Sequence, residues 1–299
     1  MNAKIPYTRI EKLLDYIHDN IQEPLSLDEL AAKSCWSRWQ LQRVFQAYTG
    51  FSVAQYVREI KLSQAALMVL DGKHRILDVA YEFGFNSEIA FSRAFKQFFG
   101  VSPKRYQSNG LKTGIKTPLT KPIKSSESVF YPENTLYQVR LEHKNAFSIN
   151  GVPSIIRGLQ SPEPDFSSTV PYAWETFFKQ TDLTNVVNVP HIGIIDMSPS
   201  QVDGELIYWA GVEQIMAEKP SNNGLICKKL EIGESSYAVL PYQGDVDEFH
   251  KAVTWLVAMW LPESGYKAVD NAFEMEIYHP PFDNDQRTIL AEYWLPIYQ

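Results

Sequence analysis

Apolar residues recur at helical spacing through the first hundred residues of the chain and at strand spacing through much of the rest. One stripe at intervals of three and four residues consists of Leu41, Val44, Phe45 and Tyr48, the pattern of an amphipathic helix. Beyond about residue 136 the apolar positions alternate in short runs, which is typical of strands. The pattern predicts a helical part followed by a part that mixes strands and helices.

The segment 27–106 contains one pattern twice, at an offset of about fifty residues. The matching positions are Ser37, Leu41, Arg43, Phe45, Gly50 and Ser52 in the first copy and Ser87, Phe91, Arg93, Phe95, Gly100 and Ser102 in the second. Each copy predicts a short helix, a tight turn and a longer helix, which together form a helix-turn-helix unit. A linking helix over 53–70 is expected to share its apolar residues with both units.

Three serine-led capping boxes predict where helices of the first copy begin, because the serine hydroxyl accepts from the third amide and the Glu or Gln side chain reaches back. They are Ser26–Glu29, Ser37–Gln40 and Ser52–Gln55.

The longer helix of each copy carries arginine, and in the first copy glutamine, away from its apolar stripe. Arginine pairs bidentately with guanine and glutamine with adenine in the major groove. A single helix of this kind is usually only a solvated face, but duplication favours DNA contact. Two such helices about 34 Å apart would read an asymmetric site of two adjacent half-sites.

Charge is distributed unevenly along the 299 residues. Residues 1–124 contain 18 Lys and Arg against 11 Asp and Glu, and residues 125–299 contain 10 against 24. The basic part can hold phosphates, whereas the acidic part would be repelled by DNA. No metal or nucleotide motif is present, so we expect no cofactor, no metal and no catalytic residue.

We expect a cytoplasmic protein with no membrane segment. The longest apolar stretch, 252–261, is far shorter than the roughly 20 residues of a membrane-spanning helix. The start lacks the pattern of a secretion signal. The two cysteines, Cys35 and Cys227, lie far apart in the sequence, which argues against a disulfide framework.

The second half shows a fainter repeat of two strands, a helix and two strands. Strands are expected at 136–141, 147–157, 191–197, 206–212, 225–232, 236–242, 272–279 and 288–297, with helices at 171–181 and 245–261. The fold class is therefore multidomain: an all-α double helix-turn-helix domain is followed by an α+β domain with antiparallel sheets, a pseudo-two-fold internal repeat and a cleft between its halves.

The residues 9–107 resemble the AraC/XylS family, above all in the stretch ILDVAYEFGFNSEIAFSRAFKQFFGVSPKRYQ. The resemblance implies DNA contacts by Arg38, Trp39, Gln42 and Arg43 in the first unit and by Ser87, Ser92, Arg93 and Lys96 in the second; Ser87 and Lys96 would touch the DNA backbone. Two departures stand out. Cys35 replaces the usual turn glycine, and Glu88 with Ile89 replaces polar uncharged residues.

The rest of the chain resembles the GyrI-like effector-binding domain through FEMEIYHP, TILAEYWLPI and YAVLPYQGDVDEFHKAVTWL. The joined domains form a Rob-like arrangement. We expect the DNA-binding domain at 1–108, a Gly-, Pro-, Ser- and Lys-rich linker at 109–128 and the effector-binding domain at 129–299. Lysines of the linker, Lys112, Lys116, Lys121 and Lys124, could add phosphate contacts or serve only to keep the linker solvated.

Glu292 is the expected ligand-facing carboxylate, because the resemblance places a glutamate there. Trp294, two residues on, faces the same side of the strand. Further walls are expected from Tyr278, Trp174, Trp209 and Tyr237. Such a site suits a small cationic or amphipathic effector. The alternative is that the aromatics belong to the core and that Glu292 pairs with Arg287 or Lys267.

The sequence therefore predicts a transcription regulator that binds double-stranded DNA and a small-molecule effector. By family analogy it is an activator that recruits RNA polymerase. A hydrolase that uses Glu292 and a neighbouring aromatic residue is the rival function, and a protein-binding inhibitor is a third.

Overall fold

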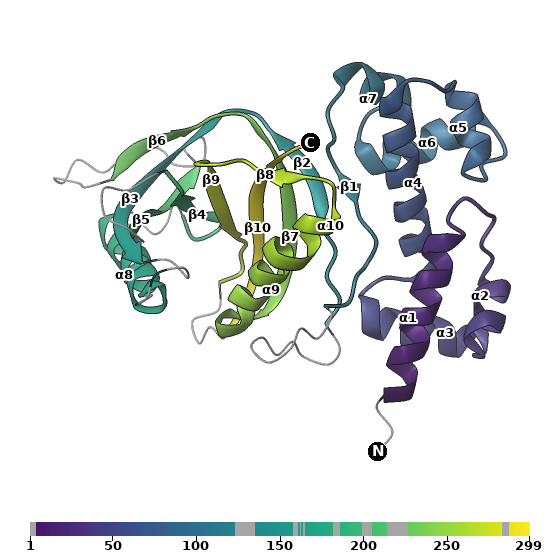
Figure 1. Cartoon of the computed structure of the whole chain (residues 1–299), viewed down its shortest axis with the longest axis horizontal. Coiled ribbons are helices and arrows are strands. Elements are labelled where there is room, and N and C mark those ends of the chain that lie inside the picture. The colour runs from purple at the N-terminus through teal and green to yellow at the C-terminus, as the bar shows by residue number, and fades with distance from the viewer. Residues whose placement is uncertain are drawn as a thin grey trace. The chain divides into compact units, whose positions relative to one another are not determined.

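The computed structural model describes residues 4–122, 135–157, 161, 163, 165–181, 186–198, 205–213, 227–282 and 287–299. The chain divides into two units, Met1–Glu142 and His143–Gln299, and each is described by itself (Figure 1). Residues 123–128 of the expected linker, 129–134 of the expected second domain and 225–226 of an expected strand lie outside the described residues.

The first unit is helical. Its helices are α1 (Lys4–Asp19), α2 (Leu27–Ser34), α3 (Arg38–Thr49), α4 (Val53–Asp71), α5 (Ile76–Glu82), α6 (Glu88–Phe99) and α7 (Pro103–Asn109). Helices α2 and α3 form one helix-turn-helix unit and α5 and α6 form the other. Helix α4 runs between the two groups (Figure 1). The predicted duplication and linking helix are confirmed.

Serine hydroxyls start α2, α3 and α4 as expected, from Ser26, Ser37 and Ser52. The reciprocal half of the capping box forms only at the second of these, where Gln40 accepts from the serine amide at 3.0 Å. Glu29 instead accepts from the Tyr16 hydroxyl at 2.6 Å, and Gln55 donates to Glu59 at 2.9 Å. Two of the three predicted boxes are therefore wrong, because each side chain has a partner other than the cap.

The turn of each helix-turn-helix unit contains one residue in the left-handed region. Cys35 has φ 54° in the first turn and Gly84 has φ 73° in the second. A left-handed conformation strains any residue with a Cβ. The first helix-turn-helix unit therefore carries a strain at Cys35, which stands in place of the usual turn glycine, and the second unit avoids this strain with Gly84.

Helix α4 is buried on more than one side and supplies core to both groups. Its buried residues are Val53, Tyr56, Val57, Ile60, Leu62, Ser63, Ala65, Ala66 and Val69. Val53, Tyr56, Val57 and Ile60 belong to a core cluster with residues of α1, α2 and α3. A helix this widely buried cannot rotate without exposing apolar surface of both helix-turn-helix units.

Residues 113–122, which we call the strap, pack on α4. The Lys116 amide donates to the Ser63 hydroxyl at 3.0 Å, and the Leu119 amide donates to the Tyr56 hydroxyl at 2.9 Å. Strand β1 (Ile115–Lys116) pairs with the start of β2 (Arg140–Lys144). The division after Glu142 thus falls later in the chain than the expected boundary, because the strap is part of the first unit.

Two lysines of the strap are used within the first unit. The Lys116 ammonium lies 2.7 Å from a carboxylate oxygen of Glu59, and Lys121 pairs with Glu11. Their expected contact with phosphates would have to break these ion pairs. Lys124 lies outside the described residues.

The second unit contains an antiparallel sheet and two helical segments. Its elements are β3 (Phe147–Arg157), α8 (Phe166–Gln180), β4 (His191–Asp196), β5 (Glu205–Glu213), β6 (Lys228–Ile232), β7 (Ser235–Asp245), α9 (Phe249–Trp255), α10 (Leu261–Glu263), β8 (Lys267–Ala268), β9 (Phe273–Tyr278) and β10 (Thr288–Tyr298). The helix expected at 245–261 is a 3-10 turn, then α9, then a π-helical turn (Leu256–Trp260). The expected strands are otherwise found within a few residues.

The strands are ordered β7-β10-β9-β4-β5-β3-β6, and β8 pairs with the end of β10. All of these neighbours are antiparallel, which confirms the predicted α+β class. The pseudo-two-fold repeat of the halves stays a prediction.

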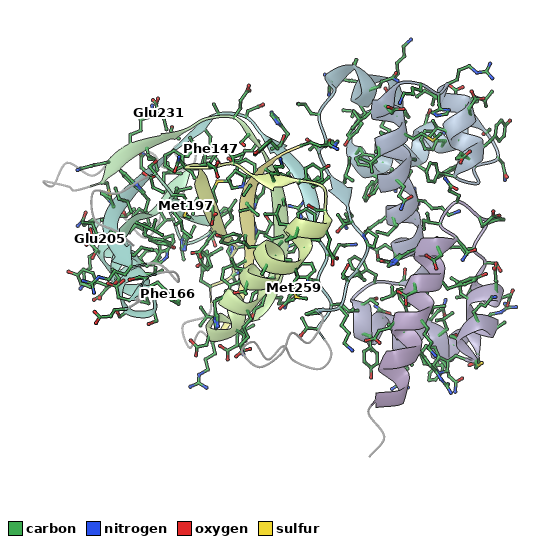
Figure 2. The ribbon with its side chains drawn as sticks, viewed as in Figure 1. Phe147, Phe166, Met197, Glu205, Glu231 and Met259 are labelled. Atoms are coloured by element: carbon green, nitrogen blue, oxygen red, sulfur yellow. The ribbon has the colours of Figure 1, made fainter. Side chains whose placement is uncertain are left out.

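Helices α8 and α9 cover the same face of this sheet. Paired residues of antiparallel neighbours point to one face, so the register places Tyr208 of β5, Glu274 of β9 and Tyr242 of β7 together. Trp174 of α8 contacts Tyr208, and Phe249 of α9 contacts Tyr242. Side chains fill the space between the sheet and the helices (Figure 2).

No helix in the described part of the chain is long and apolar enough to cross a bilayer.

Candidate DNA interface and ligand site

Helices α3 and α6 bury equivalent faces and expose equivalent faces. Leu41 and Phe45 of α3 and Phe91 and Phe95 of α6 are fully buried, so each helix is anchored by the same two positions. The opposite faces lie in solvent, and Arg43 and Arg93 are both exposed on them. These two arginines therefore remain available to DNA, as their matched positions predicted.

Trp39 is 65% exposed, which rules out a place in the core. The residue at the equivalent position of α6, Ile89, is 66% exposed. The Arg43 guanidinium lies over the Trp39 ring at 5.2 Å. This stacking holds the arginine side chain close to the helix, next to the exposed Gln42.

The remaining residues expected to contact DNA differ in exposure and in whether their side chains already have partners within the protein. Arg38 forms an ion pair with Asp28 of α2, but both side chains are about two-thirds exposed, so solvent weakens the pair. Ser87 caps α6 by accepting from the Ala90 amide at 3.2 Å. Ser92 is partly buried and Lys96 is exposed.

The six expected ligand residues lie on two opposite faces of the sheet. Trp174 and Tyr278 lie on the face that carries α8 and α9, with ring centroids 5.9 Å apart. Glu292, Trp294, Trp209 and Tyr237 lie on the other face, where the rings of Tyr237 and Trp294 are 5.4 Å apart. The two groups therefore cannot line one site.

Glu292 is engaged on its own face. The Trp294 indole donates to its carboxylate at 2.9 Å, and the His279 imidazole lies 3.7 Å away. The expectation that Glu292 and Trp294 face the same side is correct. The neighbouring aromatics Tyr237 and Trp209 belong to a core cluster with buried aliphatic residues.

The helix-covered face contains a different carboxylate, Glu276 of β9. Its Oε2 accepts from the Tyr278 hydroxyl at 2.8 Å and from the Tyr208 hydroxyl at 3.1 Å. Trp174 of α8 donates its indole N–H to the Tyr208 hydroxyl at 3.0 Å. The Tyr278 ring also contacts Phe249 of α9. Glu276 thus lies between the two helices, at the centre of an aromatic network.

Burial raises the pKa of Glu276, and the hydrogen bonds from Tyr278 and Tyr208 lower it in part. Burial, followed by the Glu276 carboxylate, raises the pKa of both tyrosines well above the ordinary value. The tyrosines therefore stay protonated and act as donors. Their hydroxyls orient the carboxylate without neutralising its charge.

Glu274, two residues before Glu276, faces the same side. It accepts from the Tyr293 hydroxyl of β10, and burial raises its pKa. In the described part of the chain neither carboxylate has a lysine, arginine or histidine as ion-pair partner, and no group of three metal-ligating residues occurs there. A buried carboxylate without a cation is costly, so this face favours a positively charged ligand.

Glu274, Glu276, Tyr208 and Tyr293 were not among the expected ligand residues. The sequence did contain a signal for the two glutamates. In FEMEIY they alternate with Met275 and Ile277, a pattern that places both carboxylates on one face of a strand whose other face is apolar.

Comparison with known proteins identifies both units. The helix-turn-helix domain family matches residues 30–109, and the GyrI-like small molecule binding domain family matches residues 139–298. The multiple antibiotic resistance protein MarA of Escherichia coli is 37% identical over 102 residues, which are 34% of this chain and 80% of MarA. The chain belongs to the AraC/XylS family of transcription regulators.

Two further comparisons each cover part of the chain. The right origin-binding protein of Escherichia coli is 38% identical over 112 residues, which are 37% of this chain and 39% of that protein. A structure of SAV2435 bound to tetraphenylphosphonium covers 54% of this chain and 93% of SAV2435, with 17% identity and a TM-score of 0.40. This AraC/XylS protein is a DNA-binding regulator with an effector-binding domain.

For this AraC/XylS regulator, Arg43→Ala and Arg93→Ala are each expected to reduce discrimination between base pairs by about 1–3 kcal/mol, because each removes a bidentate donor from an exposed helix face. Sites selected from randomised duplex DNA, followed by mobility shift on single-base variants, measure the effect. Arg75→Ala is the control, because Arg75 is also exposed but pairs with Asp78. Unchanged selectivity in both helix variants would refute the assigned roles.

Proposed function

We propose that this regulator binds an asymmetric DNA site through α3 and α6 of a single chain, activates transcription by recruiting RNA polymerase, and binds an aromatic organic cation at Glu276. The observation that carries the DNA part is the pair of exposed arginines, Arg43 and Arg93, at equivalent positions of two helices joined by α4. The observation that carries the effector part is the Glu276 carboxylate on the helix-covered face, which accepts hydrogen bonds from two tyrosines and has no ion-pair partner among the described residues.

The surroundings of Glu276 support a flat or bulky cation. Trp174, Glu276 and Tyr278 each keep part of their surface exposed, the two rings lie 5.9 Å apart, and the Tyr278 hydroxyl contacts the carboxylate. A cation beside aromatic faces gains about 0.5–2 kcal/mol, more as water is excluded. The attraction to the carboxylate adds to this gain and selects against anions of the same shape.

The same site supports a rival function. Burial raises the pKa of Glu276, and a carboxyl group of this kind, held by a tyrosine hydroxyl, is a candidate general acid or base for hydrolysis. The relatives MarA and Rob are regulators, which favours the effector function. Turnover of any bound ligand would favour the hydrolase.

Glu276→Gln is expected to weaken binding of tetraphenylphosphonium at least tenfold, because it removes the negative charge and leaves the shape. Tetraphenylborate, an anion of the same size, should bind the unaltered protein poorly and the variant no worse. Tryptophan fluorescence titration measures both ligands.

Glu292→Gln is the matched control and should leave tetraphenylphosphonium affinity within about twofold, because Glu292 lies on the other face of the sheet. If Glu292→Gln abolishes binding and Glu276→Gln does not, the ligand site is the one the sequence resemblance placed at Glu292. Equal binding of the borate and the phosphonium would refute a cation site altogether.

Acid is expected to weaken tetraphenylphosphonium binding from a higher pH than an ordinary glutamate would allow. The cation binds the ionised carboxylate, and burial raises the pKa of Glu276 above its ordinary 4.5. Affinity should be full at higher pH and fall as pH drops through the raised pKa. Titrations across the acid range measure the midpoint, and the Glu276→Gln profile should be flat. A midpoint at or below 4.5 contradicts the assignment.

Addition of the full chain is expected to increase transcription from a weak promoter placed beside a selected binding site. Transcription in vitro with purified RNA polymerase measures the transcript. The Arg43→Ala variant should give no increase on the same template. Repression by the unaltered protein would show that it is not an activator at that site.

A further inference from the structure

The two helix-turn-helix units meet at one lysine, in addition to sharing α4. Lys61 lies near the middle of α4, and its Nζ donates to the Glu23 carbonyl at 2.6 Å and to the Phe83 carbonyl at 3.5 Å. Glu23 belongs to the loop between α1 and α2, in the first helix-turn-helix region. Phe83 ends α5, in the turn of the second. One ammonium group therefore holds backbone from the loop that leads into the first helix-turn-helix unit and from the turn of the second.

The chain approaches this ammonium closely from both sides. A Cβ on Gly84 would lie 3.4 Å from Lys61 Nζ and 3.7 Å from the Gln22 carbonyl oxygen. Gly84 also has φ 73°, which a side chain would strain. The glycine thus lets the turn of the second unit reach the loop of the first, with the lysine between them.

Burial lowers the pKa of Lys61, and the Glu23 carboxylate raises it in part. The partial burial means that water competes less well for the ammonium. A hydrogen bond from a charged donor is stronger than one from a neutral donor.

Lys61 lies on the side of α4 that adjoins the DNA-reading residues. A groove of about 370 Å³ is lined by Lys61 and Arg58 of α4, by Gln42 of α3 and by Gly84 and Phe85 of the second turn. Gln42 is one of the residues expected to contact bases. A shift of the second turn relative to α3 would therefore change the separation at which bases are read.

We propose that Lys61 is a positioning residue for DNA recognition: by holding the Glu23 and Phe83 carbonyls, it sets the separation of α3 and α6 and hence the half-site spacing that the protein prefers. This inference rests on the proposed reading of two half-sites by one chain. A protein whose two helices are held at a fixed separation binds both half-sites at little entropic cost. If that separation varies, the protein loses affinity at the correct half-site spacing and tolerates other spacings.

The test uses duplexes with the selected half-sites at the native spacing and with one or two base pairs inserted or removed. Each base pair turns one half-site by about 35° and moves it about 3.4 Å. Lys61→Met keeps the aliphatic stem and loses the donors. It should lose about tenfold in affinity at the native spacing and little at the others, which flattens the spacing profile. Fluorescence anisotropy of the full chain measures each affinity.

Two variants separate positioning from charge. Lys61→Arg retains the donors and should restore the profile. Lys73→Met removes one exposed lysine that pairs with Asp71, and should leave the profile unchanged in shape. If Lys61→Met weakens every duplex equally, Lys61 is an ordinary phosphate contact and the proposal is wrong; a profile identical to that of the unaltered protein also overturns it.

A measurement without DNA keeps this inference separate from the two-half-site proposal. Spin labels at Gln46→Cys and Lys96→Cys, exposed positions of α3 and α6, report the helix separation in a chain with Cys35 and Cys227 replaced. The distribution of distances between the two labels should be narrow in the chain with Lys61 and in Lys61→Arg, and broad in Lys61→Met. Should Lys61→Met fail to fold, Gly84→Ala, which crowds the ammonium, should broaden it instead. An unchanged distribution in a folded variant refutes the positioning role, whatever the spacing profile shows.

Discussion

The recognition half of this protein depends on the burial of α4 from several sides at once. The helix has 19 residues, which span about 28 Å. Its apolar residues complete the core of the first helix-turn-helix unit before the helix continues into the second helix-turn-helix unit. Its tyrosine, Tyr56, also holds the strap, since its hydroxyl accepts from the Leu119 amide and lies 2.6 Å from His18. A rigid, shared element of this kind makes two reading helices behave as one surface, which a flexible connection could not do.

The helical half followed from the sequence because its signals are local. Capping serines, left-handed glycines and apolar spacing of three and four residues each depend on neighbours within one turn. Because the unit is duplicated, the same signals occur twice. The packing of the strap on α4 could not be predicted from the sequence, because the Gly, Pro and Lys content of the strap is that of a linker. The residues that make it part of the unit, Ser63, Glu59 and Glu11, lie far away in the sequence and meet it only after folding.

The candidate ligand site was predictable only in part, because alternation along a strand shows which residues share a face but not which face the helices cover. Glu292 and Trp294 were correctly paired with each other, and Tyr278 and Trp174 do meet. The register between β10 and β9 sets Glu292 opposite Ile277 and Glu276 opposite Tyr293, which puts the two carboxylates on opposite faces. A one-residue change in register would exchange them, and no pattern within a single strand specifies that register.

Helices α3 and α6 share one arginine at equivalent positions and differ around it, and on the proposed reading of two half-sites this difference gives the protein a direction on DNA. Trp39 and Gln42 of α3 correspond to Ile89 and Ser92 of α6, and Arg38 corresponds to Glu88. A carboxylate at the start of α6 suits the helix dipole but is repelled by phosphates, whereas α3 starts with a positively charged arginine. On this proposal the first helix-turn-helix unit contributes more of the electrostatic attraction, and we expect the two half-sites to differ in sequence. A symmetric dimer can bind its palindrome in either orientation, but a single chain whose two helix-turn-helix units are unlike is expected to prefer one orientation on its site.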